Sequence, residues 1–243
     1  MLQFYSLTDR GRLRENNQDC CVSKQIGKFT VLALADGMGG HKGGEIASLK
    51  AIETILKSLD EDLFNHIVPG QIPSLLSEVV YKANSAIYNL SLEDASLKGM
   101  GTTLELCIIA WGTAYIAHIG DSRTYRIFDT DITKLTKDHS LVEYMIDTGD
   151  ITREEAANHP QKNVITRAIG TDSVCEADIS YLRIEEGDTI LLCSDGLTNM
   201  LSEEHILSVI SSAPSLKDCA HTLVRLANDA GGTDNISVVL AKI

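Results

Sequence analysis

The sequence predicts an α+β fold, a four-layer α-β-β-α sandwich in which two antiparallel sheets are flanked by helical layers and a small flap is inserted. Strand-like segments occur in blocks separated by helical blocks, whereas a doubly wound parallel sheet would alternate strands and helices one for one. The 243 residues have 44% hydrophobic content, which is enough for one large core. Because no Pro- or Ser-rich linker divides the chain, we expect a single domain over residues 1–243.

Six segments have the alternation and β-branched content of strands, namely residues 29–35, 102–110, 113–119, 123–128, 189–194 and 236–241. Two long helices are expected between the first two strands, each with hydrophobic residues at helical spacing along one face. These residues are Ile46, Leu49, Ile52, Leu56 and Leu59 in the first helix, and Leu76, Val79, Val80, Ala83, Ile87 and Leu90 in the second.

Capping signals predict the later helices. Ser202 has the position of an N-cap, and Ser215 with Asp218 three residues on has the capping-box pattern of the next helix. Between residues 139 and 170 the pattern changes to short helical pieces, where Thr152 and Glu155 form another capping box. We interpret residues from about 139 to 170 as an inserted flap.

Four aspartates stand in turns at or beside the strands: Asp19, Asp36, Asp195 and Asp234. Gly follows directly after Asp36 and Asp195, which lets the backbone turn so that its carbonyl oxygen can join a ligand set. Carboxylate and carbonyl oxygens suit hard cations such as Mg²⁺ and Mn²⁺. The sequence therefore predicts a site for divalent cations, an arrangement typical of two-metal hydrolysis.

The formal net charge of −13 leaves no basic stripe for a phosphate backbone, so we expect no nucleic-acid partner. The same total includes the expected cation ligands. Because bound cations reverse the field locally, an anionic substrate is compatible with this acidic chain.

No signal peptide pattern stands at the N-terminus, and no apolar run approaches the roughly 20 residues that cross a bilayer. We therefore expect a cytoplasmic protein without a membrane partner. The six cysteines are scattered without a C-x-x-C pair, which is typical of reduced core thiols and argues against a zinc site.

Seven motifs follow one another along the chain. They are Arg14 to Asp19, Asp36-Gly37-Met38-Gly39-Gly40-His41 with Gly44-Glu45, Gly101-Thr102-Thr103, Gly120-Asp121-Ser122-Arg123, Asp138-His139-Ser140, Ser194-Asp195-Gly196-Leu197 and Asp234-Asn235-Ile236-Ser237. In this order and spacing they resemble the metal-dependent protein serine/threonine phosphatases, called protein phosphatase 2C-like, in their compact bacterial form. The resemblance spans nearly the whole chain, and it implies a β-sandwich flanked by helices, in agreement with the predicted layers.

The resemblance also implies Mn²⁺ or Mg²⁺ as cofactor, with two ions in the core site and a third, weaker position. In the family pattern, Asp36 matches the carboxylate that bridges two metals, the Gly37 carbonyl binds one of them, and Asp195 and Asp234 bind the other. Asp19 matches a residue that acts through metal-bound waters. Asp121 together with Asp195 matches the third position. Arg14 matches the phosphate-binding arginine, whose two parallel N–H donors suit a phosphoryl group in a way that Lys cannot reproduce.

The implied reaction is hydrolysis of phosphoserine and phosphothreonine in proteins, by in-line attack of a water that bridges the metals and without a covalent enzyme intermediate. A proton donor to the leaving alkoxide would help. His41, in the Gly-rich turn, is our candidate, with a metal-bound water as its rival. Many eukaryotic members have His directly after the Asp-Gly pair, where this chain has Met38, and many relatives have Glu in place of Gln18.

The expected partners are phosphorylated proteins, including a Ser/Thr kinase of the same cell and its substrates, and we expect a monomer. We also expect the flap, from about residue 143 to residue 160, to contact substrate as a mobile lid beside a rigid site.

Other interpretations stay open. A catalytically muted module that binds phosphoproteins, or regulates them, would keep the fold without turnover, although the presence of all four acidic positions argues against it. A two-metal phosphodiesterase or nuclease is disfavoured by the acidic surface. The C-x5-R spacing of Cys219 and Arg225 lies in a helical pattern without Gly, and the D-x-D-x-T shape at residues 129–133 lacks parallel βα repeats. We expect a helix and a polar hairpin at these two places.

Overall fold

The computed structural model describes residues 2–40 and 42–243. The strands are β1 (Gln3–Asp9), β2 (Asp19–Ile26), β3 (Phe29–Met38), β4 (Gly101–Thr102), β5 (Leu104–Ala110), β6 (Thr113–Ile119), β7 (Arg123–Phe128), β8 (Asp131–Lys134), β9 (Asp178–Arg183), β10 (Thr189–Cys193) and β11 (Ile236–Lys242). The α-helices are α1 (Gly43–Ser58), α2 (Glu61–His66), α3 (Ile72–Glu93), α4 (Leu141–Thr148), α5 (Arg153–Ala157), α6 (Asp195–Thr198), α7 (Glu203–Ser212) and α8 (Leu216–Asp229). Two short 3₁₀ turns, η1 (Pro69–Gln71) and η2 (Ala95–Leu97), flank α3.

Within the described residues the strands form two antiparallel sheets. The first has five strands in the order β1-β11-β10-β7-β8. The second has six, in the order β2-β3-β5-β6-β9, with β4 paired to β3 off this path. Because β1 and β2 belong to different sheets, residues 10–18 pass from one sheet to the other, and residues 120–122 do the same between β6 and β7.

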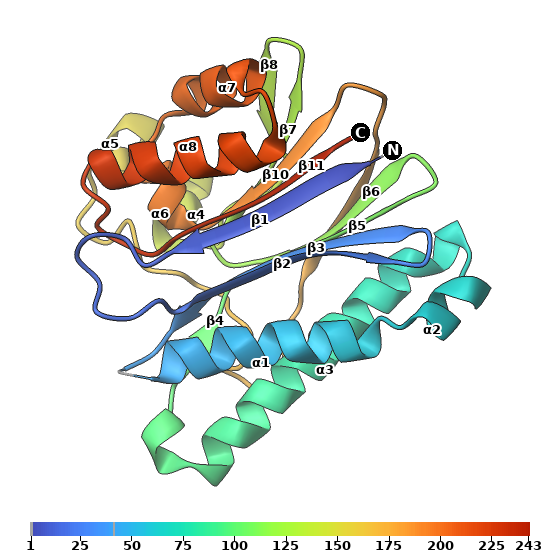
Figure 1. Cartoon of the computed structure of the whole chain (residues 1–243). Coiled ribbons are helices and arrows are strands. Elements are labelled where there is room, and N and C mark those ends of the chain that lie inside the picture. The colour runs from blue at the N-terminus through green and yellow to red at the C-terminus, as the bar shows by residue number, and fades with distance from the viewer. Residues whose placement is uncertain (1, 41) are drawn as a thin grey trace.

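Helices cover the outer face of each sheet, so the predicted four-layer sandwich is confirmed (Figure 1). The alternation along β3 shows how the layers form, because Val31 and Ala33 pack toward α1 and α3 while Leu32 and Leu34 face the other sheet. A second helical layer, α7 and α8, packs on the five-stranded sheet through side chains such as Leu223. With both faces covered, β3 is apolar at nearly every position.

Several strand predictions need correction. The strand expected at residues 102–110 is two strands, because Thr103 hydrogen-bonds the Asp36 backbone instead of continuing the ladder. The strand expected at 189–194 ends at Cys193, since Ser194 is the N-cap of α6. Strands β1, β2, β8 and β9 were not predicted from the sequence; they are mostly half-buried or exposed, which weakens their hydrophobic alternation.

The predicted caps are present. The Ser202 side chain accepts from the His205 N–H, and Thr152 with Glu155 forms a reciprocal capping box at α5. Ser215 accepts from the Asp218 N–H, but the Asp218 carboxylate accepts from the Ser215 hydroxyl rather than from its backbone.

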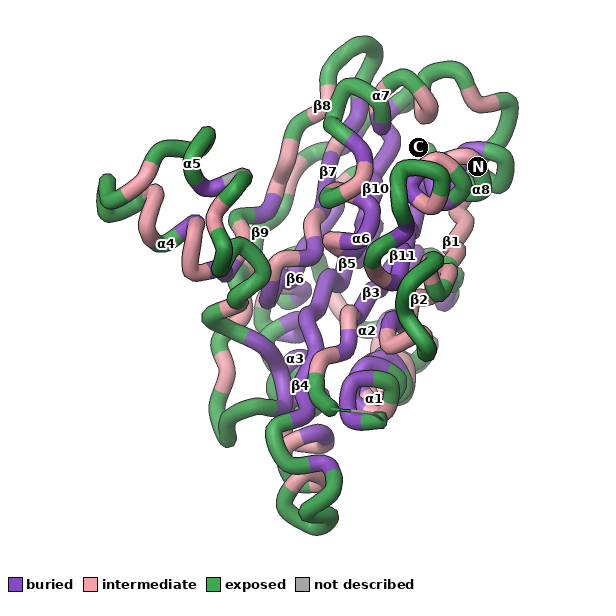
Figure 2. The backbone as a smooth tube through the Cα atoms, turned by 90° about the vertical axis from the view of Figure 1, so that its left-hand side faces the viewer, coloured by how far each residue is buried: buried purple, intermediate pink, exposed green. Residues whose placement is uncertain are grey.

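Residues 139–170, interpreted as a flap, contain α4 and α5, and the two motifs rejected as phosphatase sites lie in a helix and in a hairpin turn. Figure 2 shows α4 and α5 standing to one side of the two sheets, whose strands are mostly buried. Cys219 and Arg225 lie in α8, and Asp129 lies in the turn of the β7–β8 hairpin. Neither segment is a phosphate-binding loop.

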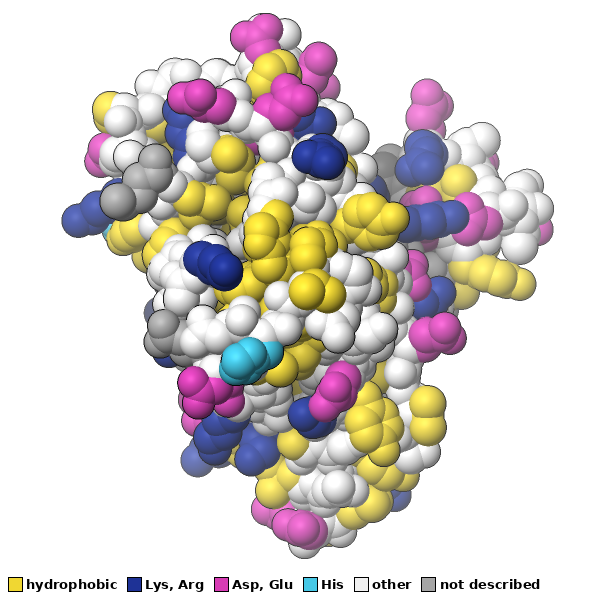
Figure 3. Space-filling view, turned by 90° about the vertical axis from the view of Figure 1, so that its right-hand side faces the viewer, with side chains coloured by type: hydrophobic (Ala, Val, Ile, Leu, Met, Phe, Trp, Pro, Cys, Tyr) yellow, Lys and Arg dark blue, Asp and Glu magenta, His cyan; other side chains and the backbone are white. Residues whose placement is uncertain are grey.

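The two chain ends lie at the end of the sandwich away from the flap (Figure 1). Hydrophobic side chains gather near the middle of this face (Figure 3). Here a cavity of about 830 Å³ is lined in part by Leu2, Phe4, Trp111, Ile184 and Ile243. None of the helices in the described ranges has the length and apolar character that would span a membrane.

Candidate active site

Asp19 and Asp36 lie directly opposite each other on the paired strands β2 and β3. Side chains at such positions have Cβ atoms about 4.5–5.5 Å apart, and two like charges there destabilise a sheet. Asp36 therefore belongs to the last part of a strand rather than to the turn that the sequence predicted. Asp19 is buried and Asp36 is half-buried, so two carboxylates in this register favour a positive charge between or beside them.

Thr103 holds the backbone of Asp36 from the other side. Its N–H donates to the Asp36 carbonyl at 2.9 Å, and its hydroxyl accepts from the Asp36 N–H at 3.0 Å. The same hydroxyl bonds Ser122 Oγ at 2.8 Å. Because Ser122 follows Asp121, one buried threonine ties together the segments that carry two of the predicted metal ligands.

Gly37 has no room for a side chain. A Cβ built there would lie 2.0 Å from the Gly44 carbonyl oxygen and 2.5 Å from that of Gln18. The close approach of these backbones explains the glycines on both sides of the turn after β3, and it leaves the Gly37 carbonyl as the backbone oxygen next to Asp36.

Asp195 and Asp234 lie beside two strands of the other sheet. Asp195 is the first residue of α6 and is separated from β10 only by Ser194, and Asp234 lies shortly before β11. Ser194 links this side to the first pair, because its hydroxyl donates to Asp19 Oδ2 at 2.9 Å. A Cβ on Gly196 would lie 2.0 Å from the Asn235 carbonyl oxygen, so the start of α6 packs directly on the backbone beside Asp234.

The carboxylates raise one another's pKa, which shows that they share one site. Burial raises the pKa of Asp36 well above its usual range, and the charges of Asp19, Asp195, Asp121 and Asp234 add to this effect, in that order. Burial likewise raises the pKa of Asp19 and of Asp195 to about 6, and that of Asp121 to about 7. Without cations, the folded chain holds these groups against strong repulsion.

Two carboxylate oxygens in this site are buried and lack a hydrogen-bond partner among the described residues, Asp19 Oδ1 and Asp195 Oδ1. Buried acceptors are normally paired, so these two atoms fit the ligands of a cation. Among the described residues, no group of three or more His, Cys, Asp or Glu side chains is arranged so that these side chains alone could hold a metal ion. The carboxylates could therefore supply part of a ligand set, which the Gly37 carbonyl and water oxygens could complete for a hard cation.

Arg14 belongs to the loop of residues 10–18, between β1 and β2, and lies at the mouth of the site. Its Nη2 atom forms an ion pair with Asp234 Oδ2 at 2.7 Å, and its side chain is 48% exposed. Asn235 holds this loop, because its side chain donates to the carbonyls of Arg10 and Asn16, each at 2.9 Å, and accepts from the Gln18 N–H at 2.8 Å. Arg14 is thus placed by a buried asparagine that neighbours a predicted ligand.

Most of the predicted site residues line one cavity of about 290 Å³, which we call the catalytic cavity. Its lining includes Arg14, Asp36, Gly37, Asp121, Asp195 and Asp234. The structure therefore brings the predicted residues from both sheets to one place. Asp19 lies behind this lining, next to Asp36. His41 lies outside the described residues, so its role as proton donor stays a prediction.

A family model described as Protein phosphatase 2C matches residues 10–237. The chain belongs to the protein phosphatase 2C family. It is 41% identical over 244 residues to protein phosphatase PhpP of Streptococcus pneumoniae, which covers 100% of this chain and 98% of PhpP.

Solved structures agree. The S. agalactiae serine/threonine phosphatase matches this fold with a TM-score of 0.93 and 37% identity, over 100% of both chains. The catalytic domain of the serine/threonine protein phosphatase PstP, solved in complex with two manganese ions, matches with a TM-score of 0.87 and 38% identity, over 99% of this chain and 97% of that one.

This protein phosphatase 2C is therefore a serine/threonine protein phosphatase, and its substrates are phosphorylated proteins. The predicted dependence on Mn²⁺ or Mg²⁺ is confirmed for the family to which it belongs.

His139 supports the segment before Asp121. Its Nδ1 atom accepts from the Gly120 N–H at 3.1 Å, so the other ring nitrogen carries the proton and donates to Asp178 Oδ2 at 3.2 Å. Burial lowers the pKa of His139, and the nearby His118 lowers it further. A neutral ring in this tautomer fits a structural role for His139 beside the site.

The supporting residues were not assigned roles from the sequence. Thr103, Ser122, Ser194 and Asn235 all lie within the quoted motifs, but their partners come from other strands. In the sequence, only their position close to a predicted ligand marks these residues as candidates for a supporting role. The sequence does not predict which groups they hydrogen-bond, because those partners depend on how the two sheets meet.

Proposed function

We propose that this chain hydrolyses phosphoserine and phosphothreonine in proteins at the catalytic cavity. The observation that carries the assignment is the cross-strand pair of Asp19 and Asp36, with Asp195 of α6 nearby and with buried oxygens on Asp19 and Asp195 that have no hydrogen-bond partner among the described residues. Repulsion within a cluster of this kind is relieved when cations neutralise it, so the cluster favours cation binding at neutral pH.

The residues that would hold two cations are Asp36, the Gly37 carbonyl, Asp195 and Asp234, with Asp19 acting through water and Asp121 contributing to a third position. When bound, the cations supply positive charge for the phosphoryl oxygens and an acidified water as the nucleophile. The raised pKa values of Asp36, Asp195 and Asp121 indicate how strongly the fold favours any positive charge there, whether a proton or a metal ion.

Arg14 would bind the phosphoryl group. Its guanidinium is half-exposed at the mouth of the cavity and is held by a single ion pair to Asp234. An incoming phosphate monoester offers two oxygens to the two N–H donors that Arg presents side by side, a stronger match than one carboxylate oxygen. In this exchange Arg14 orients the phosphoryl group, and Asp234 becomes available as a ligand.

We further propose one catalytic domain over residues 1–243, with residues from about 139 to 170 as a flap. The base of this flap is tied to the site, since the His139 N–H donates to Gly120 O at 2.7 Å and Ile169 exchanges hydrogen bonds with Thr102. Its outer helices, α4 and α5, are tied less directly, which suits a segment that contacts substrate. His41 is the proposed proton donor to the leaving group, on the basis of sequence alone.

Free thiols at all six cysteines support a reducing compartment, and we propose the cytoplasm. We also propose a Ser/Thr kinase of the same cell as the opposing enzyme, and a monomeric state.

The test is release of phosphate from a phosphothreonine peptide in the presence of Mn²⁺. We expect turnover by the wild type and loss of turnover in Asp36→Asn, with a cooperative unfolding transition retained in the variant. If the wild type binds Mn²⁺, as measured by calorimetry, but releases no phosphate, the chain is the muted phosphoprotein-binding module instead.

A further inference from the structure

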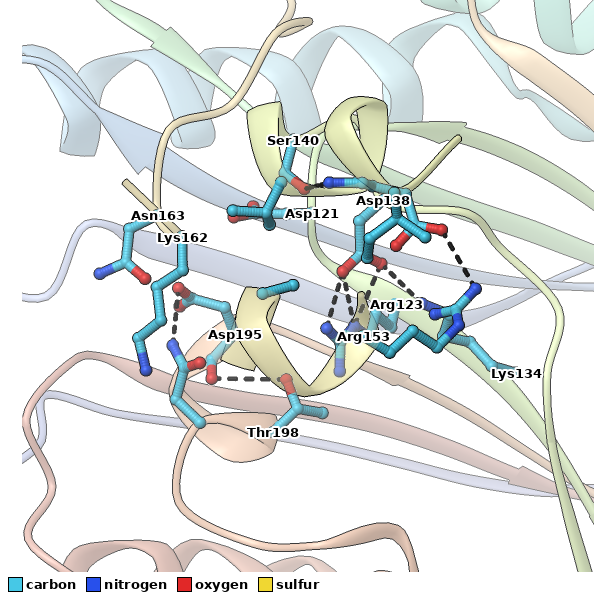
Figure 4. A pocket seen from close by; sticks show the side chains of 15 residues that line it. Asp121, Arg123, Lys134, Asp138, Ser140, Arg153, Lys162, Asn163, Asp195 and Thr198 are labelled. Atoms are coloured by element: carbon cyan, nitrogen blue, oxygen red, sulfur yellow. Dashed lines mark hydrogen bonds and ion pairs between the residues drawn. The ribbon is translucent and has the colours of Figure 1, made fainter. Parts of the chain in front are cut away.

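A second cavity, of about 390 Å³, lies between the flap and the body of the protein. We call it the flap cavity. Asp121, Asn163 and Asp195 line both this cavity and the catalytic cavity, so the two spaces share a wall. Figure 4 shows Lys162, Asn163 and Asp195 on one side of the flap cavity, and Arg123, Lys134, Asp138 and Arg153 on the other. A peptide whose phosphate occupies the catalytic cavity would have neighbouring side chains within reach of this space.

Apart from the shared wall, the flap cavity has an excess of positive charge. Its described lining contains four cationic side chains against two carboxylates, which leaves a surplus of two positive charges; the cations are Arg123, Lys134, Arg153 and Lys162, and the carboxylates are Asp138 and Glu143. The whole chain has a net charge of −13, so a cavity lined with residues of average composition would have an excess of negative charge, not of positive charge. Positive charge lining a concave site attracts anions.

The ion pairs show which of these cations is free to bind a ligand. Asp138 is shared by Arg123 at 2.7 Å and Lys134 at 3.1 Å, so both of these cations are already engaged. Arg153 makes only a long contact of 3.4 Å to Glu143, and its side chain is 73% exposed. Lys162 has no side-chain partner among the described residues, and it is exposed at the rim beside Asn163.

We propose that the flap cavity binds a second anionic group of the substrate, an acidic side chain or a further phosphate near the phosphorylated residue, with Lys162 as its main cation. The neighbouring amide of Asn163 adds hydrogen-bond donors on the same side. The inference rests on the proposed function, because cations on Asp121 and Asp195 remove the negative charge of the shared wall. The site therefore selects phosphoproteins whose target residue lies in an acidic or multiply phosphorylated segment.

The experiment compares kcat/KM for phosphothreonine peptides that differ only near the phosphorylated residue. One peptide has alanine at every flanking position, and the others carry glutamate, or a second phosphate, at one position before or after the phosphothreonine. We expect the best anionic peptide to exceed the alanine peptide by about 2- to 5-fold in the wild type, the range that one exposed charge pair contributes. High salt should remove this preference, because exposed charges are screened.

Lys162→Glu should abolish or reverse the preference, so that a peptide with lysine at the same position becomes the better substrate. Lys217→Glu makes the same change in net charge on an exposed residue at the start of α8 that lines neither cavity, and it should keep the wild-type preference. If Lys162→Glu and Lys217→Glu change the ratio of the two peptides equally, or if the wild type shows no preference for an anionic neighbour at any position, the proposal is wrong.

A binding measurement separates this proposal from the proposed function. The same peptide series with a non-hydrolysable phosphonate is titrated by calorimetry into the Mn²⁺-loaded protein. A preference for acidic peptides that depends on Lys162 supports the flap cavity even if no peptide is turned over, whereas turnover with equal affinities for all peptides supports the phosphatase and overturns the flap cavity. Inhibition by inorganic phosphate that is weakened by Lys162→Glu, without any peptide preference, would show a site for a free anion and would also overturn it.

Discussion

Replacing Asp19 by asparagine should make the metal-free protein more stable, although Asp19 is one of the predicted site residues. Asp19 is buried, at 8% exposure, and lies opposite Asp36 on the neighbouring strand. Burial raises its pKa from 3.8 to about 6, and the charge of Asp195 adds to the rise. Because the folded state holds the proton more tightly than the unfolded state, ionisation of Asp19 destabilises the fold.

The magnitude follows from the difference in pKa. Each pKa unit is worth about 1.4 kcal/mol, so a rise of roughly two units corresponds to about 3 kcal/mol at neutral pH. Asparagine removes the charge and keeps a side-chain oxygen that can accept from the Ser194 hydroxyl, which now donates to Asp19 at 2.9 Å. We expect Asp19→Asn to gain about 1–3 kcal/mol in free energy of unfolding without metal, or roughly 3–10 °C in Tm for a chain of this size.

The sign of the pH dependence gives a second, independent measurement. The folded-state pKa lies above the unfolded one, so the penalty from Asp19 is absent below about pH 4 and grows as pH rises to the folded-state value of about 6. The Tm of the wild type in EDTA should therefore approach that of Asp19→Asn as pH falls through this window. Thermal unfolding followed by circular dichroism, in EDTA and in Mn²⁺, measures both effects.

Added Mn²⁺ should reverse the order. A ligand present at 100 times its Kd stabilises the fold by about 2.7 kcal/mol, and the wild type should gain this while the variant gains less. Asp131→Asn is the matched control, because it removes an exposed carboxylate of the β7–β8 hairpin and should change stability by less than about 0.5 kcal/mol. The reasoning is refuted if, in EDTA, Asp19→Asn is less stable than the wild type at neutral pH and is less stable by the same amount at low pH.

Three other substitutions test the support of the site. Thr103→Val should lower the free energy of unfolding, measured in urea, by about 1–3 kcal/mol. The reason is that the Asp36 N–H and the Ser122 hydroxyl lose the hydroxyl that both of them bond. Thr103→Ser keeps a hydroxyl and should retain most of the wild-type stability. Asn235→Ala should lower kcat/KM for a phosphopeptide by about 10-fold or more, because the loop that carries Arg14 loses its hydrogen bonds; an unchanged kcat/KM would contradict this. Arg14→Lys should lower kcat/KM by about 10-fold with little change in Tm, because the charge remains but the paired donors are lost; a Tm loss without a kinetic loss would contradict that role.

The sequence predicted the layers and most of the acidic residues because those signals are local. Strand β3 is apolar along nearly its whole length, and the Asp-Gly pairs stand at its end and just after β10. The register of β2 on β3 could not be predicted, because β2 mixes Cys, Ser, Lys and Gln and shows little alternation. The opposition of Asp19 and Asp36 depends on that register, so the sequence named both residues without showing that they face each other.

The partners of the ligands were also out of reach from the sequence. Asn235 bonds residues more than 200 positions away in the chain, and Thr103 bonds Asp36 only because β4 and β5 are interrupted there. Such bonds are set by where two sheets meet, and no local propensity reports this. The motif as a whole identifies the residues, while the tertiary structure assigns what each one does.

With the roles proposed for Arg14 and Asp234, their ion pair should make cation binding and phosphate binding mutually dependent. Asp234 Oδ2 lies 2.7 Å from Arg14 Nη2, and the same oxygen cannot serve both the guanidinium and a metal ion at full strength. A cation bound by this oxygen would free Arg14 for a phosphoryl group, and a phosphate bound by Arg14 would free Asp234 for a cation. Linkage requires the two effects to be equal in free energy. We therefore expect a metal ion on Asp234 to favour the binding of a dianionic substrate by Arg14, despite the net charge of −13 on the whole chain.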